Sequence, residues 1–459
     1  MAVVNATASP KLSLADCLQQ QELVNYLNGT INDSTASSSP SGQAQYWLEN
    51  VDERVETSCW ALLERFAAVT IYFATNGGNW SNSHDFLTAN TSICEWNDDK
   101  DISTNGIVCS DNHVVGIKLI ENRLMGTIPS EIAFFQSLYS LYVHNWRPFS
   151  FIPSSVDTTQ EHNELHGPIP SEIGTLVNLT YLYMYNNILT GELPTTIGKL
   201  TNLRSLRFGD NAIRGDVPPE FSLLSNLKVL GAGNCQLSGR LSKDSIPGNV
   251  ENLALDNNYL TGPLPELGQC LSLERIELHN NSFSGSLSTL LGNLSNLRTL
   301  SLGYNELTGS VPNEIERLSE LKILSLGNNS ITGTIPIGLS QLSELEFLDL
   351  WGNQFQGSIE SNGSNSFPKL ESAYLHDNLF TGDLSPTFCT NRMQAYETFW
   401  ADCLRPFPEV GCTCCTLCCN NTERCETNAN YYSGCDASSP FLMVCSIPLL
   451  LSLLHGLFF

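Results

Sequence analysis

A short motif that recurs about every 24 residues constrains this chain more than any other feature. Three copies show it clearly: LRSLRFGDNAIRGDVPPEF from Leu203, LRTLSLGYNELTGSVPNEI from Leu297 and LKILSLGNNSITGTIPIGL from Leu321. Their common pattern is LxxLxLxxNxLxGxIP. A chain of 459 residues is too long for one compact globular core, whereas stacked repeats can bury their leucines against neighbouring repeats. The sequence therefore predicts a repeat protein.

The repeat is of the leucine-rich type, and its most regular position is a column of asparagines. Eleven residues occupy this column: Asn122, Asn163, Asn187, Asn211, Cys235, Asn258, Asn281, Asn305, Asn329, Asn353 and Asn378. Cys235 takes the place of asparagine in the fifth repeat, and we interpret it as a small structural substitute. About eleven repeats are therefore expected.

Each position of the motif has a physical role in the predicted fold. The LxxLxL segment forms a short strand whose leucines point inward, and stacked strands form a parallel sheet that lines a concave surface. The column asparagine lies where the chain leaves the strand, and its amide can bond backbone groups of adjacent coils. The GxIP segment begins the return path along the convex side. The expected fold class is an α/β leucine-rich-repeat solenoid wound as a right-handed superhelix.

The second repeat is interrupted. Its strand begins with LYSLYVH at Leu138, but its column residue is Asn163, which comes 17 residues late. The extra segment, NWRPFSFIPSSVDTTQE, spans residues 145–161. Removing it restores the pattern, so the segment is either a projecting loop or an unspliced intron, and the sequence leaves both open.

The LxGxIP pattern over residues 114–385 resembles the plant-specific subclass of leucine-rich repeats. That subclass builds the ectodomains of receptor-like kinases and receptor-like proteins, and also polygalacturonase-inhibiting proteins. Residues 39–113 are similar to the family's helical N-terminal cap, with ALLERFAAVTIYFATNGGNWSN as an amphipathic helix and turn and a Cys pair in CEW…NGIVCSDNHVVGIKL. The resemblance implies a disulfide between Cys94 and Cys109. Residues 1–38 are polar and are expected to be disordered, with LADCLQQQELVNYL as the one stretch of helical character.

Residues 386–435 depart from the family and are expected to form a Cys-rich C-terminal cap. Its cysteines are Cys389, Cys403, Cys412, Cys414, Cys415, Cys418, Cys419 and Cys425. The pattern Cys414-Cys415-x-x-Cys418-Cys419 has the spacing of a zinc knuckle. Disulfides are the favoured interpretation, lipidated cysteines are a third, and the number of possible pairings prevents any assignment of partners. No Gly-rich loop, HRD or DFG motif is present, so the sequence predicts no kinase domain.

Aromatic residues occupy strand positions that alternate with the leucines and therefore face the concave side. In LTYLYMY the tyrosines Tyr181, Tyr183 and Tyr185 face outward, whereas Leu182 and Met184 point into the core. Neighbouring and later repeats add further candidate ligand-binding residues at the same parity: Tyr142, His144, Arg207, Phe347, Asp349, Trp351, Tyr374 and His376. Exposed aromatics with a polar tip are typical of binding surfaces. The alternative is that the tyrosines stack across strands and only stabilise the sheet.

No catalytic centre, metal site or cofactor is expected. The middle repeats place small residues such as Gly231, Gly233, Ala254, Ser301 and Gly303 on the outward parity. HNELH, residues 162–166, resembles a zincin motif with a displaced glutamate, but the column asparagine and the leucine within it belong to the repeat scaffold. No Ser-His-Asp set or carboxylate pair is indicated by spacing, so the sequence predicts a non-enzymatic protein.

Charge and cysteine content indicate the surroundings of the protein. There are 47 acidic and 22 basic residues, a net charge of −25, which disfavours nucleic acid and anionic membranes as partners. The 16 cysteines gather toward the two ends of the chain, as disulfides in an oxidising compartment would. Sequons such as those at Asn79, Asn90, Asn178, Asn293 and Asn420 permit glycosylation. No signal peptide is visible at the N-terminus, so either the true start lies upstream or the protein enters the secretory route by its other end.

The last segment, residues 436–459, ends in FLMVCSIPLLLSLLHGLFF, an uncharged stretch long enough to cross a bilayer. A GPI-attachment signal, a single membrane span and a buried hydrophobic end are the three interpretations. The resulting hypothesis is a recognition protein on the extracellular face of the cell membrane. It would bind a protein, peptide or glycan on its concave face and signal through a co-receptor. The alternatives are a secreted inhibitor of a wall-degrading enzyme and a structural wall or ice-binding protein.

Overall fold

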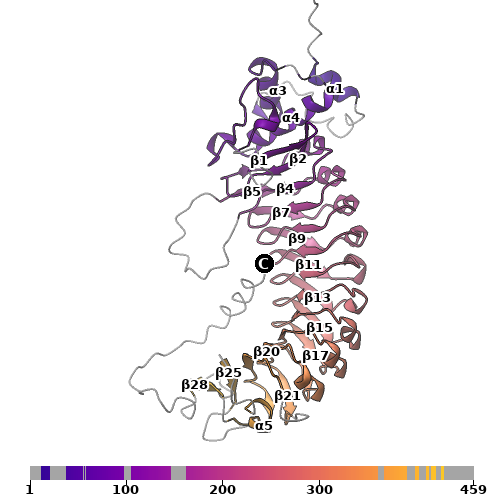
Figure 1. Cartoon of the computed structure of the whole chain (residues 1–459), viewed down its shortest axis with the longest axis vertical. Coiled ribbons are helices and arrows are strands. Elements are labelled where there is room, and N and C mark those ends of the chain that lie inside the picture. Colours follow the sequence, from indigo (N-terminus) through magenta and orange to yellow (C-terminus); the bar gives the residue numbers. More distant parts are fainter. Residues whose placement is uncertain are drawn as a thin grey trace, which may run out of the picture. The chain divides into compact units, whose positions relative to one another are not determined.

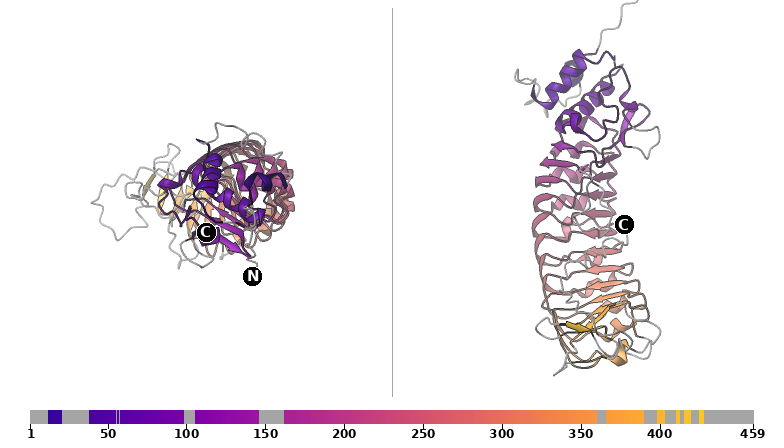
Figure 2. Two further views of the ribbon diagram at one scale, coloured as in Figure 1. Left: turned by 90° about the horizontal axis from the view of Figure 1, so that it is seen from above. Right: turned by 90° about the vertical axis from the view of Figure 1, so that its left-hand side faces the viewer.

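The structure is a computed structural model that describes residues 12–20, 38–54, 56, 58–97, 105–145, 162–359, 366–389, 398–402, 410–412, 415–419 and 425–427. The chain forms two compact units, and each is treated by itself. The N-terminal unit contains the described residues up to Ile213, and the C-terminal unit contains those from Arg214 onward. Figures 1 and 2 show both units as regular stacks of short strands. The hydrophobic tail, residues 436–459, lies outside the described residues.

Helices close one end of the N-terminal unit (Figure 1). They are α1 (Leu14–Gln20), α3 (Pro40–Asn50) and α4 (Cys59–Ala74). The Ser39 and Ser58 hydroxyls accept hydrogen bonds from the backbone N–H groups of Gly42 (3.1 Å) and Ala61 (3.2 Å), which explains where α3 and α4 begin. α4 is buried along most of its length, as its apolar sequence predicts. Among the described residues, no helix is both long enough and apolar enough to span a membrane.

Helix α1 lies within LADCLQQQELVNYL, the one stretch of residues 1–38 that was expected to have helical character. Leu14 and Leu18 are buried, and Cys17 forms a disulfide with Cys59 at the start of α4. The polar composition of the surrounding residues suggested disorder, but two apolar side chains and a cross-link fix these residues to the cap. Apart from residues 12–20, residues 1–37 fall outside the described residues.

The leucine strands form the main sheet of each unit. In the N-terminal unit its strands are, in order, β1 (Gly106–Ser110), β2 (His113–Lys118), β4 (Ser140–Tyr142), β6 (Tyr181–Tyr183) and β8 (Ser205–Arg207). β1 pairs antiparallel with β2, and the later strands are parallel. The inward residues pair in register, with Ile117 opposite Leu141, Leu141 opposite Leu182, and Leu182 opposite Leu206. The predicted concave parallel sheet of a leucine-rich-repeat solenoid is thus confirmed for this unit.

The main sheet of the C-terminal unit follows the same rule. Its strands are β10 (Val229–Gly231), β12 (Asn252–Ala254), β14 (Arg275–Glu277), β16 (Thr299–Ser301), β18 (Ile323–Ser325), β20 (Phe347–Asp349), β22 (Ser372–Tyr374), β25 (Thr398–Ala401), β27 (Leu417–Cys419) and β28 (Cys425–Thr427). All neighbours are parallel except β27 and β28. Leu300, Leu324 and Leu348 pair in register, as the repeat predicts.

A second set of short strands, most of which follow the column asparagines, was not predicted from the leucine motif. In the N-terminal unit these strands are β3 (Met125–Gly126), β5 (Glu164–Gly167) and β7 (Ile188–Glu192). From the unit boundary onward they are β9 (Ala212–Asp216), β11 (Gln236–Arg240), β13 (Tyr259–Pro263), β15 (Ser282–Ser286), β17 (Glu306–Thr308), β19 (Thr332–Gly333), β21 (Gln354–Gly357), β23 (Leu379–Phe380), β24 (Gly382–Asp383) and β26 (Val410–Gly411).

The physical reason for these strands lies in the LxG part of the motif. In β7, Leu189 is fully buried between the exposed Ile188 and Thr190, so the alternation is real but short. Gly191 then adopts a φ of 83°, in the left-handed region that favours glycine, and turns the chain toward the return path. The expected return path began only at GxIP, and no strand was predicted before it, because three alternating residues are too few to distinguish a strand from a turn.

The return path consists of short 3-10 helices. These span Ser130–Phe134, Ser171–Thr175, Thr195–Lys199, Pro219–Leu223, Lys243–Ser245, Leu267–Gln269, Thr289–Asn293, Asn313–Arg317 and Ile337–Gln341, with two more in the cap at Gly77–Asn79 and Ile93–Glu95. The helix α5 (Ser385–Phe388) follows the last repeat. Most repeat helices begin just after the motif proline, whose fixed φ suits a helix start.

The column asparagines act as expected. The Asn187 side-chain amide donates to the carbonyls of Val143 (2.9 Å) and Met184 (3.1 Å), while its oxygen accepts from the Leu165 N–H (3.1 Å). In the C-terminal unit, Asn353 repeats this pattern. One side chain thereby satisfies backbone groups of two adjacent coils that would otherwise be buried without partners.

The two ends of the inserted segment meet at Asn145 and Asn163. The Asn145 amide donates to the Asn163 carbonyl (2.9 Å), and the Asn163 N–H donates back to the Asn145 side-chain oxygen. Asn163 also donates to the Leu119 carbonyl (2.8 Å), as a column residue should. The repeat is therefore closed across the excursion, whose residues 146–161 lie outside the described residues.

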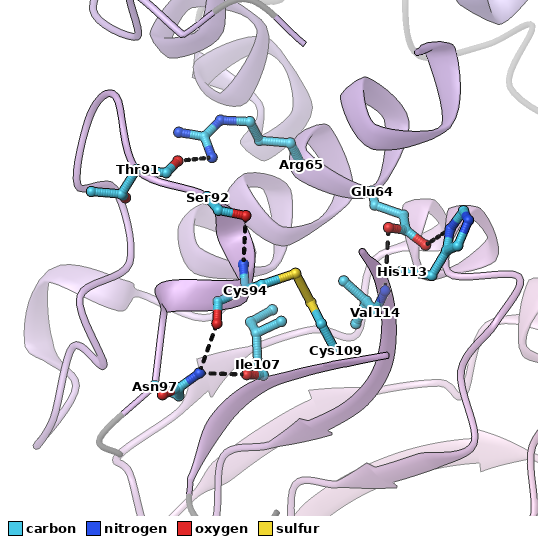
Figure 3. Close-up of a disulfide and its surroundings, with 10 residues drawn as sticks. All are labelled: Glu64, Arg65, Thr91, Ser92, Cys94, Asn97, Ile107, Cys109, His113 and Val114. Carbon is cyan, nitrogen blue, oxygen red and sulfur yellow. Dashed lines mark hydrogen bonds and ion pairs between the residues drawn. A yellow bond between two sulfur atoms is a disulfide. The ribbon is translucent and has the colours of Figure 1, made fainter. Parts of the chain in front are cut away.

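The structure contains the Cys94–Cys109 disulfide that the family resemblance implied (Figure 3). It joins the 3-10 helix Ile93–Glu95 to β1, and the Asn97 amide bridges the carbonyls of Cys94 and Ile107 beside it, each at 3.0 Å. On the other side of the same region, the buried Glu64 of α4 accepts from the Val114 N–H (3.3 Å) and lies 3.5 Å from His113. Burial raises the pKa of the Glu64 carboxyl.

Replacing both Cys94 and Cys109 by serine is expected to lower the free energy of unfolding by about 3 kcal/mol, because the bond closes a loop with a sequence separation of 15. Urea denaturation followed by tryptophan fluorescence measures the change, since Trp80 and Trp96 lie in the cap. Unfolding curves that coincide with those of the unmodified protein would contradict the prediction.

At the C-terminal end, Cys412 is bonded to Cys415, and Cys389 is also in a disulfide. Cys415 is one of the four cysteines of the possible zinc knuckle. Because its sulfur is already in a disulfide, it cannot act as a thiolate ligand. The disulfide interpretation of this cap is therefore favoured over the metal site; Cys403 and Cys414 fall outside the described residues.

Candidate functional site

Two aromatic surfaces occupy the outward positions of the main sheets, one in each unit. We call the first the N-terminal aromatic surface and define it by Lys118, Tyr139, Tyr142, His144, Tyr181, Tyr183, Tyr185 and Arg207. We call the second the C-terminal aromatic surface and define it by Tyr304, Phe347, Asp349, Trp351, Tyr374, His376 and Trp400. Each lies within a single unit.

Strand parity places the tyrosines of β6 as expected. Leu182 and Met184 are fully buried, whereas Tyr181, Tyr183 and Tyr185 are partly exposed. The register sets Tyr183 between Tyr142 on β4 and Arg207 on β8. The alternation in LTYLYMY therefore separates a core face from a face that solvent and ligands can reach.

The rings of this surface pack against one another as well. Tyr142 and Tyr183 have ring centroids 4.8 Å apart, and His144 stacks on Tyr185 at 4.1 Å with an interplanar angle of 18°. Tyr139 meets Tyr181 edge to face at 5.4 Å. Cross-strand stacking, the structural alternative for these residues, is thus present. It holds the rings in place without covering them.

Two cations of the protein lie over these rings. The Arg207 guanidinium is 5.3 Å from the centroid of Tyr183, and the Lys118 ammonium is 5.8 Å from that of Tyr142. Both arrangements have cation–π geometry. Lys118 was not among our candidates, because it ends the first strand, where the leucine pattern is weak.

Burial controls the protonation of this surface. It raises the pKa of Tyr142 and of Tyr185 to about 12, so both hydroxyls stay protonated and can donate hydrogen bonds. It lowers the pKa of His144 to about 4, so this imidazole is neutral at physiological pH. His144 is only 6% exposed. Its position is that of a support beneath Tyr185 rather than of a contact surface.

The C-terminal aromatic surface is more deeply packed. The Trp351 and His376 rings are parallel within 9° at 5.6 Å, and Trp400 lies 5.4 Å from His376 and 5.2 Å from Tyr374. Tyr374, His376 and Asp349 are buried, whereas Phe347, Trp351 and Trp400 remain partly exposed. Trp400 was not among our candidate residues, because the segment around it lacks the leucine motif.

A carboxylate lies within this second surface. Asp349 accepts hydrogen bonds from the Ser325 hydroxyl (2.8 Å) and from the Trp351 N–H (3.3 Å). Burial raises the pKa of Asp349 to about 7 and that of the nearby Tyr304 to about 12. Burial lowers the pKa of His376 to about 4.

The middle of the C-terminal unit is polar rather than bare, which corrects our expectation. β14 carries Arg275 and Glu277 at outward positions, paired at 3.2 Å, and His279 follows the strand at the same parity. His279 Nδ1 lies 3.2 Å from the Ser301 hydroxyl, and its Nε2 lies 3.7 Å from an Asp256 oxygen. We had considered glycine, alanine and serine positions and passed over these charged ones.

Asp256, His279 and Ser301 include the residue types of a hydrolytic triad, but the arrangement does not suit catalysis. A nucleophile must be reachable, and Ser301 is only 5% exposed. The distance from His279 to Asp256 is also too long for the hydrogen bond that would orient the imidazole. This cluster is best explained as a polar network that fixes neighbouring strands.

Comparisons with known proteins agree with the repeat assignment. Family models described as leucine-rich repeats match residues 295–355, and residues 178–200 and 272–294. Comparison with curated proteins finds no match. Many solved structures match.

One similar structure is the leucine-rich-repeat ectodomain of the plant membrane receptor kinase GASSHO1/SCHENGEN3 from Arabidopsis thaliana, solved in complex with CASPARIAN STRIP INTEGRITY FACTOR 2. It is 32% identical, with a TM-score of 0.57, over 66% of this chain and 35% of that chain. The present chain thus spans about a third of that ectodomain. A plant ice-binding protein matches at 22% identity and a TM-score of 0.51, over 69% of this chain and 94% of that chain, and shows the fold alone.

Proposed function

The chain is a plant-type leucine-rich-repeat protein, and we propose that it recognises an extracellular peptide or protein ligand on the outward face of its main sheet. The observation that carries the proposal is the N-terminal aromatic surface. Packing of the leucine core does not require aromatic residues at the opposite parity, and yet Tyr181, Tyr183 and Tyr185 all occupy it.

The chemistry of this surface suits a peptide. Tyrosines offer large contact area at low entropic cost, and their protonated hydroxyls can donate to backbone carbonyls of a ligand. Stacking between neighbouring rings holds them in place before binding, which reduces the cost of ordering them in a complex. Arg207 and Lys118 add positive charge beside the rings of Tyr183 and Tyr142, so a ligand with an acidic group is favoured here.

The similarity to a receptor-kinase ectodomain supports recognition rather than catalysis. That ectodomain was solved with its bound factor, and we transfer only the general role of ligand binding to this chain. A receptor-like protein at the cell surface would pass the signal to a co-receptor. An ice-binding role is less well supported, because a mixed aromatic and charged face lacks the regular polar ladder that such a surface would need.

Changing Tyr183 to Ala is expected to weaken ligand binding by at least about fivefold, which corresponds to about 1 kcal/mol for the loss of an interface anchor. The measurement starts from a displayed library of random peptides selected against the full chain. The affinities of the selected peptides are then determined for both proteins.

Two control variants separate binding from folding. Tyr259 is 66% exposed on β13, outside the main sheet, so Tyr259→Ala should leave affinity unchanged. Met184→Ala truncates a buried side chain next to Tyr183 and should destabilise the fold by about 2–5 kcal/mol. If Tyr183→Ala unfolds the protein while the affinity per folded molecule stays the same, the tyrosines only stabilise the sheet and the proposal is wrong.

A further inference from the structure

The C-terminal aromatic surface differs from the N-terminal one in its charge. Neither lysine nor arginine occurs at the outward positions within its described strands, β16, β18, β20, β22 and β25. Arg298 and Lys322 directly precede β16 and β18, and Lys322 is paired with Glu346 at 2.8 Å. The same positions carry the carboxyl groups of Asp349 and, just after β25, Asp402. In the N-terminal aromatic surface, by contrast, Arg207 and Lys118 already lie over tyrosine rings. Aromatic rings therefore lie beside lysine and arginine in the N-terminal unit and beside carboxyl groups in the C-terminal unit.

Trp351 is one of three partly exposed rings of this surface, and it lies next to the Asp349 carboxyl group. It is partly exposed, and it rests against the backbone of Gly327, where a Cβ would approach its Nε1 and Cδ1 atoms to 2.6 Å. His376 supports one face of the indole, and Tyr304 meets it edge to face at 5.7 Å. The indole is thus fixed from several sides, with the Asp349 carboxyl group beside the same glycine.

Aromatic rings attract cations through the negative potential of their faces, and the attraction increases when a carboxylate adds to it. Trp351 supplies the ring, and Asp349 supplies the carboxylate above about pH 7, because burial raises its pKa to about 7 and the titration is therefore done at pH 8. His376 does not oppose them, because its buried Nδ1 has no hydrogen-bond partner among the described residues and burial keeps the imidazole neutral near pH 7. The net charge of −25 adds a favourable long-range field for positively charged ligands.

We propose that the C-terminal aromatic surface binds a cationic side chain, lysine or arginine, of the peptide ligand, with Trp351 as the main ring and Asp349 as the countercharge. This inference rests on the proposed function, since it specifies one chemical feature of the ligand. It assigns the acidic and the basic recognition elements to different units of the chain. A neutral oligosaccharide could also stack on exposed indoles, and the experiment distinguishes it.

The test uses the full chain and calorimetric titration with the amidated hexapeptide acetyl-Lys-Gly-Lys-Gly-Lys-Gly. Matched probes replace lysine by norleucine or by glutamate, and cellohexaose represents a neutral oligosaccharide. We expect saturable binding of the lysine peptide alone. Trp351→Ala and Asp349→Asn should each weaken that binding at least about fivefold, which is within the range of one desolvated cation–π contact.

Three variants serve as controls and additional tests. Glu306→Gln removes one exposed negative charge from the same unit, and Tyr183→Ala alters only the N-terminal aromatic surface, so both should leave binding unchanged. Ser372→Lys introduces a cation at a partly exposed outward position of β22 and should abolish binding of the lysine peptide. Circular dichroism and thermal melting confirm that each variant is folded.

Three results would overturn the inference. The first is no saturable binding of the lysine peptide, the second is an equal loss in Glu306→Gln, and the third is Trp351-dependent binding of cellohexaose or of the norleucine peptide instead. None of these results affects the proposed function. Library-selected peptides that depend on Tyr183 would still support recognition by the N-terminal aromatic surface.

Discussion

Replacing Arg65 by Ala is expected to destabilise the N-terminal cap by about 3–5 kcal/mol, the cost of leaving a buried charge without its partner. The Arg65 side chain is fully buried, and its Nε lies 2.5 Å from an oxygen of Asp52, which is itself 2% exposed. A second guanidinium nitrogen donates to the Thr91 carbonyl at 2.8 Å. The indoles of Trp47 and Trp96 lie 5.4 and 4.8 Å from the guanidinium carbon.

This one side chain therefore connects α3, α4 and the loop before β1. Urea unfolding of the full chain, followed by tryptophan fluorescence, measures the effect. The matched control is Arg54→Ala, because Arg54 pairs with Glu56 at 2.8 Å but is 33% exposed, and such pairs contribute less than about 1 kcal/mol. Removing both buried charges, with Arg65→Met and Asp52→Asn together, should restore much of the loss. Equal effects of Arg65→Ala and Arg54→Ala would contradict the prediction.

The sequence predicted the repeat part of the fold but not the buried ion pair of the cap. The leucine pattern predicts the register of the main sheets, because the inward positions of LxxLxL can be buried in only one way. The column asparagines follow for the same reason, since each has a fixed backbone environment in the stack. The Arg65–Asp52 pair was not predictable, because the two residues are 13 positions apart and nothing local marks either as buried.

The candidate site was likewise predictable only in part. Strand parity alone places Tyr183, Trp351 and the other candidates on the outward face. Strand parity does not reveal how deeply each side chain is packed. The burial of His144 and Asp349 depends on tertiary contacts, so it could not be predicted from the sequence. Trp400 and Lys118 lie where the repeat pattern fades toward the caps. The local motif therefore predicts the direction of a side chain but not its neighbours.

Asp349 is expected to give the protein a pH-dependent loss of stability toward neutral pH. Its carboxyl is 4% exposed, and burial raises its pKa from 3.8 to about 7, although Ser325, Trp351 and Gly327 donate hydrogen bonds that oppose the rise. Because the pKa is higher in the folded state than in the unfolded state, the folded state binds this proton more tightly. The stabilising contribution is complete below about pH 4 and is lost as the pH rises through about 7.

The rise in pKa from 3.8 to about 7 corresponds to about 4 kcal/mol. The difference in unfolding free energy between Asp349→Asn and the unmodified protein should therefore change by about 4 kcal/mol between acidic and neutral pH. The free energy of unfolding is measured for both proteins between about pH 4 and pH 8.5. Relative to the unmodified protein, the variant should gain stability as the pH rises from about 4 to about 7 and then keep a constant difference, whereas Glu306→Gln controls for the loss of one exposed carboxyl.

Comparing the variant with the unmodified protein is essential, because His376 acts in the opposite direction. Burial lowers its pKa from 6.5 to about 4, so the stability that it contributes above pH 6.5 is lost as the pH falls through 4. In the unmodified protein, the Asp349 and His376 contributions to the pH dependence of the unfolding free energy have opposite signs and partly cancel between about pH 4 and pH 6.5. A flat stability profile of the unmodified protein in that range would therefore be uninformative. His376 is unchanged in Asp349→Asn, so its contribution drops out of the difference between the two profiles. A difference that stays constant with pH would mean that Asp349 is charged throughout, and the carboxyl would then be stabilised by more than the three donors around it.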